Sequence, residues 1–349
     1  MALMQLFHAN NQNNLRRNRI FRDRLNPLDA YDDHELLYRY RMSRQTLMRV
    51  IDMVRDDIVH ETQRSYALTP EQQTFAAIRY YATGSFQTVV GDIMGISQPS
   101  MSRIVQRVSS ALCRHAGQYI RFPTTPRFQQ AVKEGFMNEF TFPNVLGCVD
   151  GSLVQIKAPS TREDMYVCRK GYHALNIQGI CDSQKKFLNL VVRWPGSSHD
   201  AFIWNESGVK RYMENHADCG YLLGDQAYPL QPYLLTPVRN PQSDGELAYN
   251  RLHQRTRQRV EDTFGRWKCR WLMLHKFGGA ITIELKNAIK AIIATGVLHN
   301  ICEEDGVPIP EDDVPPMGRN DNGDDVNVND HDDNAGITVR ARLIRERFE

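Results

Sequence analysis

The chain has 349 residues, 41% hydrophobic and 9% aromatic, so it can fill the cores of about two packed domains. It has no apolar run near the roughly 18 residues of a membrane span, no signal peptide and no paired cysteines, so we expect an intracellular protein with reduced thiols. The net charge is +2, but residues 303–334 hold twelve acidic residues against one Arg, which leaves the remainder basic and favours a polyanionic partner.

Residues 1–30 are polar and basic, and we predict a flexible arm. Five arginines gather there and form a loose candidate nuclear import signal: Arg16, Arg17, Arg19, Arg22 and Arg24. Basic residues that only contact solvent would give the same composition.

A helical domain is predicted over residues 31–140. Apolar positions recur at helical spacing between Asp32 and His60 and indicate two helices. Thr69 before Pro70 is typical of a helix start, and Gly84 ends that helix. A further helix is expected at 126–140.

Within this domain, residues 85–114 show the layout of a helix-turn-helix. Two helical patterns meet at Gly95-Ile96-Ser97, and the second has an apolar face with polar residues elsewhere. Four residues of this second helix are predicted to contact DNA: Gln98, Ser100, Arg103 and Arg107. Ordinary packing of two helices joined by Gly would give the same pattern.

Residues 141–302 change to β character. Short β-like runs occur at 145–150, 153–157, 173–182, 187–194, 221–225 and 233–237. A helical stretch at 200–216 interrupts them, and two long helices follow residue 245. Strands followed by strands alternating with helices predict an α/β fold, a mixed sheet covered by helices. Residues 303–349 are predicted to be an acidic, disordered tail with a short basic, helical end.

Three carboxylates lie where this fold could bring them together. Asp150 and Asp225 end apolar strands, and Glu261 lies within a helix, with 35 residues between it and Asp225. Oxygen ligands of this kind suit Mg²⁺ or Mn²⁺, and two such ions would support phosphodiester chemistry. Strand-end aspartates are also common turn or helix caps, and a helical Glu is often only solvated.

The motifs around these acids resemble Harbinger-type transposases. The matching strings, in order, are GCVDGS, RKGYHALNIQGICD, WPGSSHDAFIW, YLLGDQAYP, VEDTFGRWK and GVLHNIC. The preceding TGSFQTVVGDIMGISQPSMSRIV is also similar, so the resemblance covers about residues 35–305. It implies a ribonuclease H-like fold for residues 141–302 and a catalytic D, D, E site on Asp150, Asp225 and Glu261.

Asp200, in PGSSHDAF, is the open question of this site. The ribonuclease H-like strand order favours Asp225 as the second acid, and Asp200 could be a further metal ligand or only cap its helix. His199 could contact phosphate or pack. Tyr228 and Trp204 are expected in the core, and His299 with Asn300 as a buried, satisfied polar pair.

Basic residues near the acids are predicted to hold the DNA backbone. The predicted contacts are Arg169, Lys170, Arg259, Arg266 and Lys268, with His173 as a weaker candidate. A basic helix beside an acidic pocket could hold phosphates while the metal site stays negative.

The leading hypothesis is a divalent-metal-dependent DNA endonuclease or transposase that acts on double-stranded DNA at transposon ends and targets. One alternative is a domesticated DNA-binding or assembly protein without cleavage activity, and another is a metal phosphohydrolase of small substrates. The resemblance further implies a nuclear location, a Myb-like helper protein for import and DNA binding, and a possible homo-oligomer.

Overall fold

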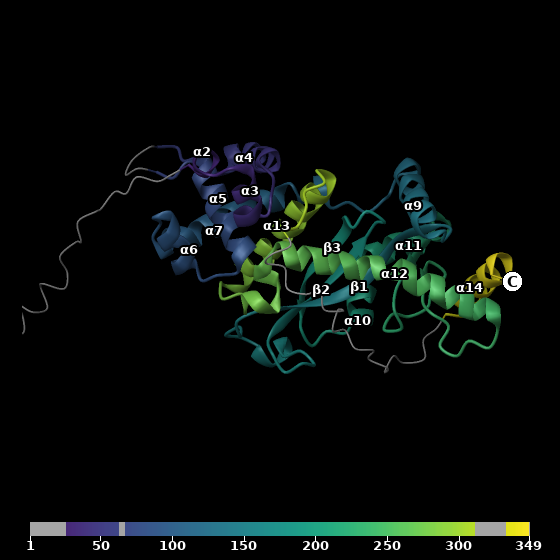
Figure 1. The fold of residues 1–349 in the computed structure, drawn as a ribbon. Helices are drawn as coiled ribbons and strands as arrows, with labels where there is room; N and C mark the ends of the chain where they lie inside the picture. The colour runs from purple at the N-terminus through teal and green to yellow at the C-terminus, as the bar shows by residue number, and fades with distance from the viewer. Residues whose placement is uncertain (1–25, 63–66, 311–332, 349) are drawn as a thin grey trace, which may run out of the picture.

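The computed structural model describes residues 26–62, 67–310 and 333–348. Residues 1–25 of the predicted arm and 311–332 of the predicted acidic tail lie outside these residues. The end of the arm was wrongly predicted as flexible, because Pro27–Ala30 form a helix capped by Asn26, and the start of the tail was also wrong, because a helix continues to Glu304. Helices make up the N-terminal part (Figure 1): α2 (Pro27–Ala30), α3 (Asp33–Tyr40), α4 (Arg44–Ile58), α5 (Pro70–Thr83), α6 (Gln87–Met94), α7 (Gln98–Arg114), α8 (Ala116–Tyr119) and α9 (Pro126–Phe140).

The ends of α5 follow directly from the sequence. The Thr69 side chain accepts a hydrogen bond from the Gln72 amide, the Gln72 side chain accepts one from the Thr69 amide, and Pro70 occupies the first turn. Gly84 then adopts a left-handed conformation with φ of 65°. The predicted start and end of this helix are confirmed.

Helix α7 is the central helix of the N-terminal part. Its predicted apolar face is buried and packs against α5 on one side and α13 (Leu285–Glu304) on the other. The predicted pair α6 and α7 is present and is joined through Gly95, which is left-handed with φ of 64°. Because α7 is packed on several sides, only a narrow polar strip of it remains exposed.

Five strands form one mixed sheet: β1 (Val145–Gln155), β2 (Ala174–Cys181), β3 (Phe187–Pro195), β4 (Tyr221–Leu223) and β5 (Leu234–Leu235). The order is β3-β2-β1-β4-β5; β1 to β3 are antiparallel neighbours, and β4 and β5 run parallel to β1. This order and these directions are those of the ribonuclease H-like fold that the motifs imply.

The two runs predicted at 145–150 and 153–157 are one strand, which corrects the expected break between them. Gly151 and Ser152 continue the ladder by pairing with Gln178 and Ile177. A Gly-Ser pair often marks a turn, but both residues are buried here and their backbone stays extended. Asp150 therefore lies inside β1 and not at its end.

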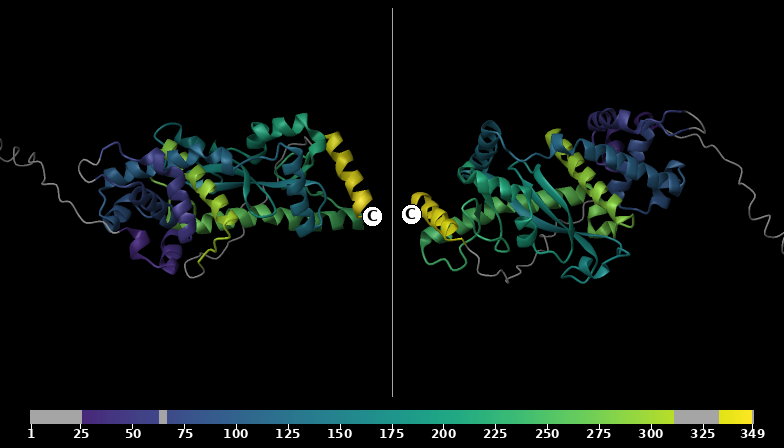
Figure 2. Two further views of the ribbon diagram at one scale, coloured as in Figure 1. Left: turned by 90° about the horizontal axis from the view of Figure 1, so that it is seen from above. Right: turned by 180° about the vertical axis from the view of Figure 1, so that it is seen from behind.

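Helices cover both faces of the sheet. After β3 come α10 (Asp200–Asn205) and α11 (Gly208–Asn215), two helices where one stretch was expected, because Ser207 caps the second. The long helix α12 (Asp244–Arg270) lies along one face with α13, whereas α10 contacts β2. Figure 2 shows these layers from two further directions.

The chain ends in α14 (Asn334–Arg347), at the opposite end of the molecule from α6 (Figure 1). The expected basic helix is therefore present, and it packs against β5 and α12. One hydrophobic core runs through the N-terminal helices, the sheet and α14. All seven cysteines are free, and no helix of the described residues is long and apolar enough to cross a membrane.

Candidate active site

Asp150 is buried at the centre of the sheet, with 1% of its surface exposed. Alternate residues of a strand point to opposite faces. Cys148 contacts the Thr256 carbonyl of α12, and Asp150, two residues on, points to the same helix. The Gly151 amide donates to Asp150 Oδ1 at 2.8 Å, which fixes the carboxylate against its own strand.

Glu261 meets Asp150 through an arginine. Arg257 lies one turn before Glu261 on α12, forms an ion pair with Glu261, and places its Nη1 3.4 Å from Asp150 Oδ2. Its guanidinium thus bridges the first and third predicted catalytic acids. In the sequence, Arg257 is one of many basic residues of this helix. Only the packing of α12 on β1 shows that it is the one that contacts both acids.

Asp225 lies at the same level of the sheet as Asp150. Leu223, the last residue of β4, is opposite Cys148 of β1; Asp150 follows two residues later within β1, and Asp225 follows two residues beyond the end of β4. The Asp225 Oδ1 accepts a hydrogen bond from the Ala227 amide at 2.9 Å, which holds the turn after β4.

Asp200 approaches the centre from the other face. Asn176 donates to Asp200 Oδ1 at 2.9 Å and to the Ser198 carbonyl at 2.8 Å, so Asn176 positions the start of α10. The Asp200 carboxylate packs on Gly151, where an added Cβ would lie 2.6 Å from its carboxyl carbon. Only a glycine in β1 leaves room for this acid.

The three aspartates affect one another electrostatically. Burial and then the charge of Asp225 raise the pKa of Asp150 well above its usual value, and Arg257 opposes this shift. Burial raises the pKa of Asp200 to about 6; the Asn176 hydrogen bond lowers it and the charge of Asp225 adds to it. Burial likewise opposes the charged form of Arg257, but Asp150 and Glu261 raise its pKa overall.

Tyr228 is buried as expected, but it belongs to this site and not only to the core. Gln178 donates to the Tyr228 hydroxyl at 3.1 Å, and burial followed by the charge of Asp200 raises the pKa of this phenol. The motif YLLGDQAYP contains the only signal for this role, because Tyr228 follows Asp225 by three residues.

The predicted DNA contacts fall into different environments. Arg169 and Lys170 are exposed on the loop before β2, and the charge of Arg169 reaches Asp200. Lys268 donates to the Leu153 carbonyl of β1 at 2.8 Å, and burial with the charge of Lys170 lowers its pKa to about 8. These three residues lie around the acids.

Other predicted contacts are engaged within the chain. Arg259 forms an ion pair with Glu139 of α9, and Arg266 contacts both oxygens of Glu303 at 3.0 Å. Arg107 donates to Gln73 Oε1 at 2.9 Å. On α7, Gln98 and Arg103 are exposed and Ser100 is half-buried.

The remaining motif residues are structural. Asn300 donates to the Phe187 and Tyr119 carbonyls and accepts from the Phe187 amide, so its amide group is fully used. His299 hydrogen-bonds the Lys185 carbonyl at 2.8 Å. Trp204 is buried and donates to Gln231 at 2.8 Å. His199 is the exposed residue before α10.

The oxygen ligands of this site suit a hard divalent cation. Among the described residues, however, no three His, Cys, Asp or Glu side chains are close enough together to hold a metal ion. Arg257 supplies positive charge between Asp150 and Glu261, and it offsets the repulsion among the aspartates only in part. The donor chemistry fits a metal, and the Arg257 guanidinium lies between two of the acids.

Comparisons with known proteins agree with the motifs. The family model described as DDE superfamily endonuclease matches residues 149–300. HARBI1 of Homo sapiens is 37% identical over 284 residues, 81% of either chain. HARBI1 of Rattus norvegicus is 35% identical over 323 residues, 92% of either chain. The Antagonist of Like Heterochromatin Protein 1 of Arabidopsis thaliana is 26% identical, over 84% of this chain and 78% of that protein.

Among solved structures, a piggyBac transposase synaptic complex with hairpin DNA is 10% identical, with a TM-score of 0.33 over 95% of this chain and 84% of that one, too low to indicate a common fold. The sequence relatives and the family model confirm the resemblance that the motifs indicated. The chain belongs to the Harbinger transposase-derived nucleases of the DDE superfamily, the family that includes HARBI1.

Proposed function

We propose that this chain cleaves double-stranded DNA, and joins DNA strands, with divalent metal ions bound at Asp150, Asp225 and Glu261. The observation that carries the proposal is the group of buried Asp150 and half-buried Asp200 and Asp225, in which the charges of Asp225 and Asp200 raise the pKa of Asp150. Like charges buried together are costly, and such sites are typical of functional centres.

The side chains of this cluster have distinct roles in the proposal. Asp150, Asp225 and Glu261 are the ligands, with Mg²⁺ or Mn²⁺ as the ions. Two bound ions would activate the attacking water or 3′-hydroxyl and stabilise the leaving oxygen. Asp200, held by Asn176, is a further ligand or orients water beside them. Arg169, Lys170 and Lys268 surround the acids and are proposed to hold the DNA backbone.

Nicking of supercoiled plasmid with Mg²⁺ or Mn²⁺ tests this proposal. We expect cleavage by the wild type and a loss of at least about 100-fold in Asp150→Asn, Asp225→Asn and Glu261→Gln. Asp218→Asn changes an exposed aspartate away from the cluster and is the matched control. DNA binding without any metal-dependent nicking by the wild type would contradict the proposal and favour a DNA-binding or assembly protein.

The same assay addresses a small-substrate phosphohydrolase. If DNA is the substrate, duplex DNA should compete strongly against a small phosphoester, and the phosphoester should not inhibit nicking. The reverse order of inhibition would contradict a DNA nuclease.

We further infer a nuclear location that depends on a Myb-like helper, and a homo-oligomer on DNA, from the family resemblance. A fluorescent fusion expressed with and without the helper, and the mass of the protein on DNA, test these points. A fusion that enters the nucleus alone would contradict the dependence on a helper.

A further inference from the structure

Two phenylalanines from distant parts of the chain are exposed to solvent and line the same cleft. Phe86 precedes α6 and Phe277 lies in the short 3₁₀ turn Lys276–Gly278; they are 67% and 66% exposed. Both line one cleft of about 490 Å³ between the N-terminal helices and the nuclease part. Exposure of two large aromatic rings in one cleft is unusual for a surface that contacts only water.

The turn that carries Phe277 is rigidly supported. A Cβ added to Gly84 would lie 2.9 Å from the Gly278 Cα, and one added to Gly278 would lie 2.8 Å from the Leu272 carbonyl carbon. The following segment pairs with the end of β1, where Ile281 exchanges hydrogen bonds with Gln155 and Lys157 at 3.0 and 2.9 Å. Phe277 is thus fixed in an exposed position by close backbone packing.

A histidine and a lysine accompany the exposed ring. His275 stacks on Phe277 with the ring centroids 4.9 Å apart and the planes at 13°, and Lys276 Nζ lies 5.8 Å from the Phe277 centroid. Burial, followed by the charges of Lys268 and Lys276, lowers the pKa of His275 and so favours its neutral form. An aromatic face beside a lysine is complementary to a base and its phosphates, more than to an apolar protein surface.

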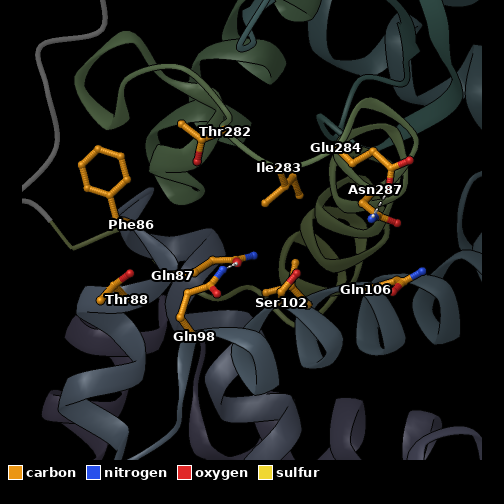
Figure 3. A pocket seen from close by; sticks show the side chains of 11 residues that line it. Phe86, Gln87, Thr88, Gln98, Ser102, Gln106, Thr282, Ile283, Glu284 and Asn287 are labelled. Carbon is orange, nitrogen blue, oxygen red and sulfur yellow. Dashed lines mark hydrogen bonds between the residues drawn. The ribbon is translucent and has the colours of Figure 1, made fainter. Parts of the chain in front are cut away.

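The cleft continues toward α7. Phe86 also lines a neighbouring cleft of about 360 Å³, in which Gln98, Ser102 and Gln106 of α7 face Thr282 and Asn287 (Figure 3). Amide and hydroxyl groups of this kind can hydrogen-bond base edges. In Figure 3, Gln98 lies beside Gln87, to which it donates at 3.2 Å.

In the other direction the turn leads to the acids. Ile281 joins β1 at Gln155, five residues beyond Asp150, which corresponds to about 17 Å along the strand. That is roughly the length of five base pairs of DNA. The cleft that the two rings line therefore reaches Ile281 at the end of β1, and it adjoins the cleft lined by the polar strip of α7.

We propose that Phe277, with Phe86 beside it, stacks on an unpaired or unstacked base of the DNA substrate several base pairs from the bond that is cut. This inference rests on the proposed DNA substrate. Phe277 is a positioning residue here, since it would fix the register of the DNA relative to the acids without touching the reacting phosphate.

Binding assays with the full chain test the proposal. Fluorescence anisotropy is measured in EDTA with two probes of equal length, a duplex with a gap of a few unpaired thymines and the fully paired duplex. We expect Phe277→Ala to weaken binding of the gapped probe about 10-fold and of the paired probe much less. Phe277→Trp should restore the preference, and Phe86→Ala should reduce it in the same direction.

Met48→Ala is the matched control, because Met48 is 50% exposed but lies on α4, away from both clefts. If Phe277→Ala binds both probes like the wild type, the stacking proposal is wrong although the DNA substrate stands. If the wild type binds neither probe, the proposed function itself fails. A defect that is equal for both probes would also overturn the stacking role.

Discussion

Gly151 shows how one missing side chain shapes the acid cluster. A Cβ at this position would lie 2.6 Å from the Asp200 carboxyl carbon, inside contact distance. In Gly151→Ala we expect Asp200 to move off Asn176 and nicking to fall at least about 10-fold, at a cost of about 1–3 kcal/mol in stability. Nicking rates and urea unfolding check this. Gly208→Ala, where no heavy atom lies within 4 Å, should leave both unchanged.

Arg257 is the positive partner of Asp150 and Glu261, so its removal should destabilise the protein through repulsion between these acids. Because Arg257→Met leaves Asp150 and Glu261 without their positive partner, we expect the metal-free protein to lose about 3 kcal/mol of stability. Mn²⁺ should then raise the melting temperature more in Arg257→Met than in the wild type, since the ion replaces the lost charge. Thermal unfolding in EDTA and in Mn²⁺ measures both effects.

The control for Arg257 is Arg255→Met, an exposed arginine on the same helix. If Mn²⁺ raises the melting temperature equally in all three proteins, the metal does not replace the positive charge of Arg257 at the acids.

His253 makes stability depend on pH. It is buried and hydrogen-bonded to the Leu235 carbonyl at 3.0 Å, and burial lowers its pKa from 6.5 to about 4. Between these values the unfolded chain binds a proton that the folded chain does not, so this contribution is complete above pH 6.5 and is lost as the pH falls toward 4. His253→Gln removes the titration but keeps a donor.

As the pH falls across this window, the free energy of unfolding of the wild type should decrease by about 3 kcal/mol more than that of His253→Gln. Urea unfolding between pH 4.5 and 7.5 measures it. Parallel pH profiles of the two proteins would mean that folding does not lower the pKa of His253.

Among the elements, the C-terminal helix α14 packs against β5, the edge strand of the sheet. Arg340 donates to the Thr236 carbonyl at 3.0 Å, the Asp333 amide to the Leu230 carbonyl at 3.1 Å, and Leu343 and Ile344 are buried. These contacts lie on both sides of the two-residue strand β5. The helix therefore covers a short edge strand that would otherwise be open to other chains.

Leu343→Ala should consequently lower the free energy of unfolding by about 2 kcal/mol, because it empties part of this interface. Arg345→Ala, on the exposed side of α14, should change it by less than about 0.5 kcal/mol. Urea unfolding compares them, and equal values would mean that α14 is not docked in solution.

The elements with strong local signals could be predicted from the sequence, and their mutual packing could not. The limits of α5 and α9 follow from Thr69, Gly84 and Pro126, where caps and turns fix the backbone. The single strand β1 was missed because Gly151 and Ser152 look like a turn until their pairing with β2 is known. Docking of α14 likewise depends on β5, a hundred residues earlier.

The site divides in the same way. Its three principal acids stand in recognisable motifs, whereas Arg257, Gly151 and Tyr228 acquire their roles only when α12, β1 and β4 meet. Arg259 and Arg266 were predicted to contact DNA because they flank Glu261. Their ion pairs with Glu139 and Glu303 join elements far apart in the chain, which spacing along one helix cannot reveal.

The whole molecule should unfold as one unit, because α13 belongs to both parts of the core. It packs against α7 over one portion of its length and against β3 over another, and Tyr81 of α5 contacts Trp271 directly. The four tryptophans all lie beyond residue 190, so their fluorescence reports the nuclease part. Far-ultraviolet circular dichroism reports the helices of both parts.

Leu112→Ala, deep in α7, separates cooperative from independent unfolding. We expect it to cost about 3 kcal/mol and to shift the tryptophan and circular dichroism transitions together, although no tryptophan lies in the N-terminal helices. Gln106→Ala, on the exposed strip of α7, should shift neither. If the dichroism transition shifts and the tryptophan transition does not, the N-terminal helices unfold separately. Phe86 and Phe277 would then not be held in one rigid cleft, because they belong to different parts of the chain.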